Sequence, residues 1–208
     1  MLATTLTHIT AQFAGQFPLV YRAVICSPVT PTFLRRSIVS KLLPPINFEQ
    51  WIEDNREAFK PPVGNKQIWE DADFMAFVIG GPNARKDYHI DPSEEFFYQI
   101  EGDMTLKIVE DGEFKEIPIK EGEIFLLPSM VPHSPQRPEG TIGLVIEHKR
   151  QEGDNDGLRW YCDECGEVLH EASFYLTDIV EQLREAIQSF WADDEARTCG
   201  NCGAYLEQ

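Results

Sequence analysis

The chain has 208 residues, of which 42% are hydrophobic and 11% aromatic, and it carries a formal net charge of −17. This composition is typical of a globular protein with one core of ordinary size, and not of a disordered chain. The acidic balance argues against a nucleic-acid partner, since affinity for nucleic acid comes from clustered Lys and Arg. No apolar run approaches the roughly 18–20 residues of a membrane-spanning helix, so we expect no membrane partner. A small anionic substrate is not excluded, because a few arginines in a pocket can bind it.

The beginning of the chain differs from the rest in charge. Residues 1–48 contain four basic residues and no acidic one, which leaves a charge of −21 on residues 49–208. An acid-free segment with Thr and Ser is typical of mitochondrial or plastid targeting sequences. We therefore expect residues 1–45 to be an N-terminal extension, either targeting or disordered. Without targeting, we expect the protein in the cytoplasm.

The body of the chain begins with a short predicted helix and continues with strands. In the segment 47–59, NFEQWIEDNREAF, Asn47 is a good cap residue and the apolar residues share one face. Short strand-like runs closed by turn residues follow, and many of them at such spacing favour an all-β sandwich or barrel. They cover residues 67–71, 73–81, 95–102, 104–111, 113–120, 123–128 and 142–149.

The polar turn QEGDNDG at residues 151–157 predicts a module boundary after Arg150. The tail, residues 151–208, contains two C-x-x-C-G knuckles and a predicted helix at about residues 177–191 between them. Two such knuckles favour a closed tetrahedral site of four thiolates, as in rubredoxin or a zinc ribbon. We expect Cys162, Cys165, Cys199 and Cys202 to hold a structural Fe or Zn; a thioredoxin-like redox pair is the alternative.

Two spaced motifs in the strand-rich region suggest a second metal site. His89, Glu95 and Gly102 follow the pattern H-x5-E-x6-G, and Gly122, Pro128 and His133 follow G-x5-P-x4-H. With this pair of motifs the sequence resembles the cupin superfamily. The resemblance implies a mainly β fold: a double-stranded β-helix, or jelly-roll barrel, over residues 46–150.

The candidate ligands of this site are His89, Glu95 and His133. Asp91 stands where many cupins have a further histidine, and Met130 stands at a glycine position of the second motif. Two histidines and one carboxylate leave adjacent positions open on an octahedral metal, which suits Fe(II). Zn would usually close to four ligands.

Longer strings narrow the resemblance. KPPVGN, GGPN-x-R-x-DYH, EEFFYQ, EGEIFLLP, HSPQRPEG and WYC-x-x-CG closely resemble the 3-hydroxyanthranilate 3,4-dioxygenase family, in its form with an extra C-terminal metal knuckle. The likeness covers about residues 46–205.

The resemblance implies an Fe(II)-dependent cleavage of the ring of 3-hydroxyanthranilate by O₂. The product would be 2-amino-3-carboxymuconate semialdehyde, which cyclises to quinolinate on the route from tryptophan to NAD. Arg137 would hold the substrate carboxylate, with Arg85 beside the carboxylate and O₂. Glu147 and Glu95 would contact the substrate, and Asn65 would help to close the site. A homodimer is also expected.

Two other functions fit a cupin. One is a different cupin oxygenase, which would leave the pair Arg85 and Arg137 unexplained. The other is a non-enzymatic cupin that binds a carboxylate without consuming O₂.

Overall fold

The computed structural model describes residues 42–61, 64–177 and 179–208. The expectations for the N-terminal extension lie, up to residue 41, outside the described residues. The chain divides into two units between Pro44 and Pro45, and residues 45–208 form one of them. No described helix is long and apolar enough to cross a membrane.

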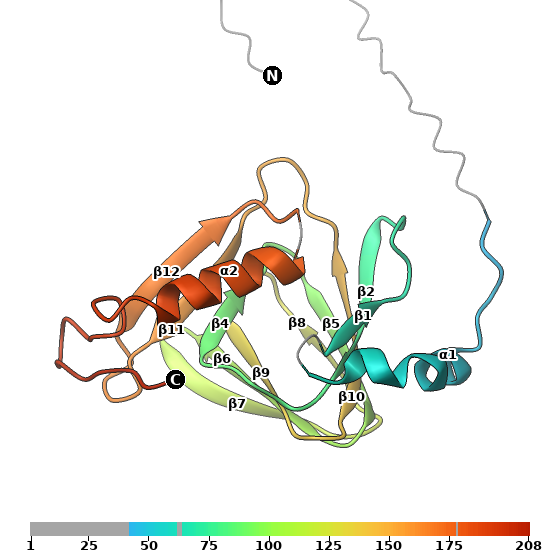
Figure 1. The fold of residues 1–208 in the computed structure, drawn as a ribbon, viewed down its shortest axis with the longest axis horizontal. Helices are drawn as coiled ribbons and strands as arrows, with labels where there is room; N and C mark the ends of the chain where they lie inside the picture. Colours follow the sequence, from blue (N-terminus) through green and yellow to red (C-terminus); the bar gives the residue numbers. More distant parts are fainter. Residues whose placement is uncertain (1–41, 62–63, 178) are drawn as a thin grey trace, which may run out of the picture. The chain divides into compact units, whose positions relative to one another are not determined.

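Two antiparallel sheets make up most of this unit (Figure 1). The first has the strand order β1-β2-β10-β5-β8. Its strands are β1 (Asn65–Gln67), β2 (Phe74–Gly80), β5 (Glu95–Glu101), β8 (Ile124–Leu127) and β10 (Ile142–His148).

The second sheet has the order β12-β11-β4-β9-β6-β7, with β3 paired to β9. From β4 to β11 the chain passes repeatedly between the two sheets, which is the winding of a double-stranded β-helix, and the expected jelly-roll class is confirmed. Its strands are β3 (Asn83–Ala84), β4 (Asp87–Ile90), β6 (Met104–Glu110), β7 (Glu113–Ile119), β9 (His133–Arg137), β11 (Asp156–Tyr161) and β12 (Val168–Phe174).

Alternation along the strands decides which side chains lie between the sheets. In β5, Glu95, Phe97 and Gln99 are buried, while the residues between them are half-buried on the other face. Phe97 belongs to an apolar cluster with Leu106, Leu127 and other buried residues. Each such side chain contributes about 1.5–3 kcal/mol on burial. The same period of two turns the polar Glu95 and Gln99 inward.

The predicted N-terminal helix is confirmed as α1 (Phe48–Asn55), followed by a 3₁₀ turn at Arg56–Phe59. The side chain of Asn47 accepts a hydrogen bond from the Gln50 amide, as expected of an N-cap. Ile52 packs with Phe59 and with residues of β2 and β10, so the helix covers an end of the first sheet.

Two turns show where local sequence did and did not decide the structure. Asp111 and Gly112 have positive φ angles and join β6 to β7 in a hairpin, the turn that an Asp-Gly pair favours. The strand predicted at 67–71 lies instead at Asn65–Gln67, and the residues after it turn, with the Gln67 side chain donating to the carbonyl of Trp69.

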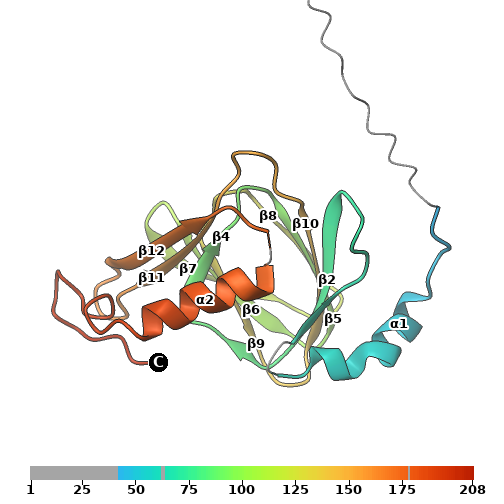
Figure 2. The ribbon, with the colours of Figure 1, turned by 45° about the horizontal axis from the view of Figure 1, so that its top comes forward.

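The tail is part of the barrel sheet, which corrects the boundary expected after Arg150. β11 pairs with β4 of the barrel on one side and with β12 on the other. The helix α2 (Ile179–Trp191) lies across these strands (Figures 1 and 2). Phe190 of α2 stacks on Trp160 of β11, and both are buried. Residues 45–208 therefore form one unit that does not divide at residue 150.

Candidate metal and substrate site

His89, Glu95 and His133 meet between the two sheets, as the motif spacing predicted. His89 on β4 pairs in register with His133 on β9, while Glu95 comes from β5 in the opposite sheet. The Glu95 Oε1 atom lies 3.0 Å from Nε2 of His133 and 3.4 Å from Nδ1 of His89. One potential ligand atom of each residue lies within 4.8 Å of the others, and all three side chains are buried.

The electrostatics of this cluster fit a bound cation. Oε1 of Glu95 is buried and has no hydrogen-bond partner, although two imidazoles point toward it. Burial lowers the pKa of His89, but the hydrogen bond to Asp156 and the nearby carboxylate of Glu95 outweigh it and raise the pKa to about 10. Burial raises the pKa of Glu95, but the charges of His133 and His89 hold it well below the ordinary value. Positive charge is thus favoured where the three ligand atoms converge.

Asp91 and Met130 occupy the two positions where the sequence departs from the cupin motifs. Oδ1 of Asp91 accepts from the amide and hydroxyl of Ser93, and Oδ2 accepts from Nη2 of Arg150 at 2.8 Å. Asp91 therefore has partners away from the histidines. Met130 has a φ of 64°, a conformation that glycine adopts most easily, which agrees with a glycine position in the cupin motif.

Arg137 is a buried cation with unused donors. Its Nη1 donates to Oε1 of Gln99 at 2.9 Å, and its Nε has no hydrogen-bond partner. Among the described residues, no carboxylate forms an ion pair with it. Burial lowers the pKa of Arg137 to about 10, against a raising effect of Glu95, so it stays charged at pH 7. A buried, unneutralised guanidinium is what an anionic ligand requires.

Arg85 has a different environment from Arg137. It lies between β3 and β4, and its guanidinium forms an ion pair with buried Asp87. Burial lowers the pKa of Arg85, but the charges of Asp87 and Glu95 raise it above the ordinary value.

Glu147 lies next to Glu95, because the two residues face each other in the register of β10 and β5. It is buried, and its pKa is raised well above the ordinary value by burial and by nearby Asp91 and Glu95. Oε2 of Glu147 accepts a hydrogen bond from Nη2 of Arg150.

Sequence reasoning missed Arg150 and Asp156. Oδ1 of Asp156 lies 2.8 Å from Nε2 of His89, and Arg150 contacts Asp156, Glu147 and Asp91. Arg150 immediately precedes the polar turn at residues 151–157 that predicted a module boundary, and Asp156 lies within it. Only the pairing of β11 with β4 brings Asp156 to His89, 67 residues away in sequence, and no local signal could have shown it.

The four cysteines of the tail also meet as predicted. Sγ of Cys162 lies 3.5 Å from that of Cys202, and Sγ of Cys165 lies 3.6 Å from that of Cys199. A disulfide would be near 2.05 Å, whereas a tetrahedral metal with bonds of about 2.3 Å separates its sulfurs by about 3.8 Å. Amide groups of Cys202 and Asn201 lower the pKa of Cys199 to about 7, which favours the thiolate that a metal binds.

Comparison with known proteins assigns the family. A model described as 3-hydroxyanthranilic acid dioxygenase matches residues 41–191. A 3-hydroxyanthranilate 3,4-dioxygenase of Ruegeria pomeroyi is 59% identical over 158 residues, covering 76% of this chain and 88% of the relative. The chain belongs to the 3-hydroxyanthranilic acid dioxygenase family.

More distant members of this dioxygenase family align over a similar length. The 3-hydroxyanthranilate 3,4-dioxygenase of Bacillus thuringiensis is 49% identical, covering 82% of this chain and 96% of the relative. That of Candida albicans is 54% identical, covering 76% and 92%. A solved cupin-2 domain protein from Shewanella frigidimarina is 22% identical with a TM-score of 0.41, covering 50% of this chain and 93% of its own.

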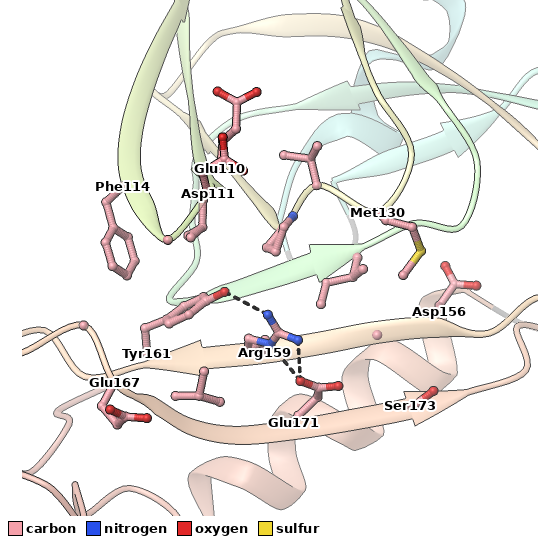
Figure 3. A pocket seen from close by; sticks show the side chains of 18 of the residues that line it. Glu110, Asp111, Phe114, Met130, Asp156, Arg159, Tyr161, Glu167, Glu171 and Ser173 are labelled. Carbon is pink, nitrogen blue, oxygen red and sulfur yellow. Dashed lines mark hydrogen bonds and ion pairs between the residues drawn. The ribbon is translucent and has the colours of Figure 1, made fainter.

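This dioxygenase also has a hollow that Asp156, the hydrogen-bond partner of His89, lines. It has a volume of about 670 Å³ and lies between the β6–β7 turn and the strands β11 and β12. Figure 3 shows Phe114 and Tyr161 at one end and Met130 and Asp156 at the other, with Arg159 bonded to Tyr161 and Glu171. His89, Glu95 and His133 do not line it.

Asn65, expected to help close the dioxygenase site, is half-buried at the start of β1 and pairs in register with Ile79. Its part in closing the site stays a prediction, as do the roles of the other site residues.

Proposed function

We propose that this enzyme is an Fe(II)-dependent dioxygenase that opens the ring of 3-hydroxyanthranilate. The observation that carries the substrate assignment is buried Arg137, whose guanidinium has unused donors and no carboxylate partner among the described residues. The relatives are named for this activity, and they align with this chain over most of their length. Two imidazoles and one carboxylate suit Fe(II), which when bound would supply the activation of O₂.

In this proposal the protein binds and orients the substrate. Arg137 holds the ring carboxylate through charge-assisted hydrogen bonds, and Arg85, fixed by Asp87, adds positive charge nearby. His89, Glu95 and His133 would hold the iron, whose chemistry the bound substrate would meet. Orientation of this kind contributes much of the rate of a reaction between bound partners.

Glu147 is proposed to contact the substrate amino or hydroxyl group. Its raised pKa suits a group that exchanges a proton with the substrate, because a carboxyl of ordinary pKa would stay ionised near pH 7. The ring bond next to the hydroxyl-bearing carbon breaks and both atoms of O₂ enter the product, 2-amino-3-carboxymuconate semialdehyde. Its spontaneous cyclisation to quinolinate would place the enzyme on the route to NAD.

The test is an assay of the Fe(II)-reconstituted protein with 3-hydroxyanthranilate. Absorbance of the semialdehyde and O₂ uptake are followed together, and we expect one O₂ consumed for each product formed. Substrate binding without O₂ uptake would instead support a carboxylate-binding cupin. No change in either signal would refute the proposal.

His133→Ala tests the metal assignment. It removes one of three ligands, so we expect loss of the catalytic iron and of turnover. The metal of the four-cysteine site should remain, since none of its ligands changes; metal content per chain measures both. Turnover that persists in this variant would contradict the ligand assignment.

A further inference from the structure

Arg150 has contacts that a linker residue would not need. Its side chain is only 1% exposed. Its Nη2 lies 2.8 Å from Oδ2 of Asp91, 2.9 Å from Oε2 of Glu147 and 2.6 Å from Oδ1 of Asp156. Its Nη1 donates to the carbonyl of His148, which fixes the plane of the guanidinium.

Asp156 connects this guanidinium to a candidate metal ligand. Its carboxylate accepts two hydrogen bonds from Arg150, from Nε at 2.8 Å and from Nη2 at 2.6 Å. The same Oδ1 lies 2.8 Å from Nε2 of His89, and Asp156 is fully buried. With Nε2 held in this way, Nδ1 of His89 faces Glu95. Carboxylates that bind the second nitrogen of a ligand histidine fix the orientation of its ring.

We propose that Arg150 and Asp156 act together as positioning residues, Asp156 orienting the His89 imidazole toward the metal and Arg150 holding Glu147 toward the substrate. Neither is expected to touch the substrate. The identity of metal and substrate rests on the proposed function, whereas the contacts themselves do not.

Stability alone is a weak reason for this arrangement. A buried guanidinium among carboxylates loses its hydration, and apolar residues of similar size often stabilise a fold equally well. All three carboxylates that Arg150 contacts are connected with the site. Glu147 lies beside Glu95, Asp156 is hydrogen-bonded to His89, and Asp91 lies beside Glu147. The contacts therefore indicate control of geometry.

The metal arm of the test compares Asp156→Asn with Asp163→Asn. Asp163 is exposed and pairs with Lys86, so its variant removes the same charge from the tail without touching His89. Fe(II) is titrated without O₂ against a chelator, with metal content per chain as readout. We expect Asp156→Asn to weaken the catalytic site about 10–100-fold, with the four-cysteine metal retained. An affinity within twofold of the unaltered protein would overturn the role of Asp156.

The substrate arm compares Arg150→Lys with Arg159→Lys. Arg159 forms a surface ion pair with Glu171 on the same tail, so its variant is a matched control. Lys keeps the charge that neutralises the carboxylates but not the planar fork. We expect Arg150→Lys to bind 3-hydroxyanthranilate about ten-fold more weakly on iron-loaded protein without O₂, with a melting temperature close to that of the control. If Arg150→Lys binds 3-hydroxyanthranilate as tightly as the unaltered protein does, only the charge is needed, and positioning by Arg150 would be overturned.

The double variant Arg150→Lys/Asp156→Asn tests the pair as one device. Because Nε and Nη2 of Arg150 hold the Asp156 carboxylate, we expect Arg150→Lys alone to weaken iron binding as well, and the combined loss of iron affinity to be smaller than the product of the two single losses. Multiplying effects would refute the pairing. Failure of the unaltered protein to bind iron or turn over would refute the proposed function instead, which separates the two.

Discussion

Two arginines that look alike in sequence differ in the free donors they retain. Arg85 is committed to Asp87, whereas Arg137 bonds to the neutral Gln99 and keeps Nε unpaired. Leaving a buried charge without a partner is costly, so a folded protein keeps one where a ligand supplies the counter-charge. Arg137 is therefore the better candidate for the substrate carboxylate.

Arg137→Met tests this at the residue scale. We expect kcat/KM for 3-hydroxyanthranilate to fall about 10–100-fold, the value of a charged hydrogen bond or two. 2-Aminophenol, which lacks the carboxylate, is the control substrate, and kcat/KM for it should fall little. An equal loss with both substrates would contradict a carboxylate-specific role.

Gly143→Ala should reproduce the effect without removing the charge. A Cβ at Gly143 would lie 2.6 Å from Nη1 of Arg137 and 2.8 Å from Oε1 of Gln99, so the guanidinium must move. Because both side chains are buried, we expect a raised KM for 3-hydroxyanthranilate with little change for 2-aminophenol. Unchanged kinetics with both substrates would show that the guanidinium tolerates displacement.

At the element scale, β11 connects the two candidate metal sites. Asp156 begins the strand and bonds to His89, while Cys162 directly follows its last residue, Tyr161. Between them, Leu158 and Trp160 are fully buried, and Trp160 packs on α2. Pairing with β4 anchors the Asp156 end independently of the cysteines.

Cys162→Ser should therefore affect stability more than chemistry. Loss of one thiolate weakens the four-cysteine site, and we expect a lower melting temperature or solubility with near-normal turnover per catalytic iron. Cys26→Ser, which removes the cysteine that belongs to neither C-x-x-C pair, serves as the control. A folded Cys162 variant that had lost turnover per iron would contradict a structural role for the tail metal.

At the scale of the whole molecule, residues 45–208 act as one unit, and the sequence boundary after Arg150 predicts the wrong truncation. A chain ending at Arg150 loses β11, which pairs with β4, and loses Asp156 beside His89. We expect it to be insoluble or unable to bind catalytic iron. Removal of residues 2–40 is the control and should leave turnover within about twofold, since the family match begins at residue 41. An active chain ending at Arg150 would show that the barrel is independent.

The outer face of the first sheet is where we expect the proposed homodimer to form. On the edge strand β8, Ile124 and Leu126 are 65% and 54% exposed, and they face half-buried Tyr98 and Phe96 of β5. Exposed apolar strips of this kind mark interaction surfaces. Leu126→Glu should shift the mass in solution from dimer to monomer with turnover retained, whereas Lys107→Glu on β6 should not. A Leu126→Glu variant that stays dimeric would place the interface elsewhere.

The sequence by itself determined the elements whose signals are local. Asn47 capped its helix, Asp111-Gly112 formed its hairpin, and the two spaced motifs brought His89, Glu95 and His133 together. These predictions are correct because a cap, a turn and strand alternation depend on neighbouring residues, and because the family pattern supplied the spacing of the distant ligand.

Only the tertiary structure decided which charges are already paired. Arg85 is paired with Asp87, and Arg137 keeps free donors. Arg150 and Asp156, from the polar turn at residues 151–157 and the residue before it, contact each other next to the site. The physical reason is that burial and pairing of a charge depend on residues distant in the chain, here on β11 joining β4.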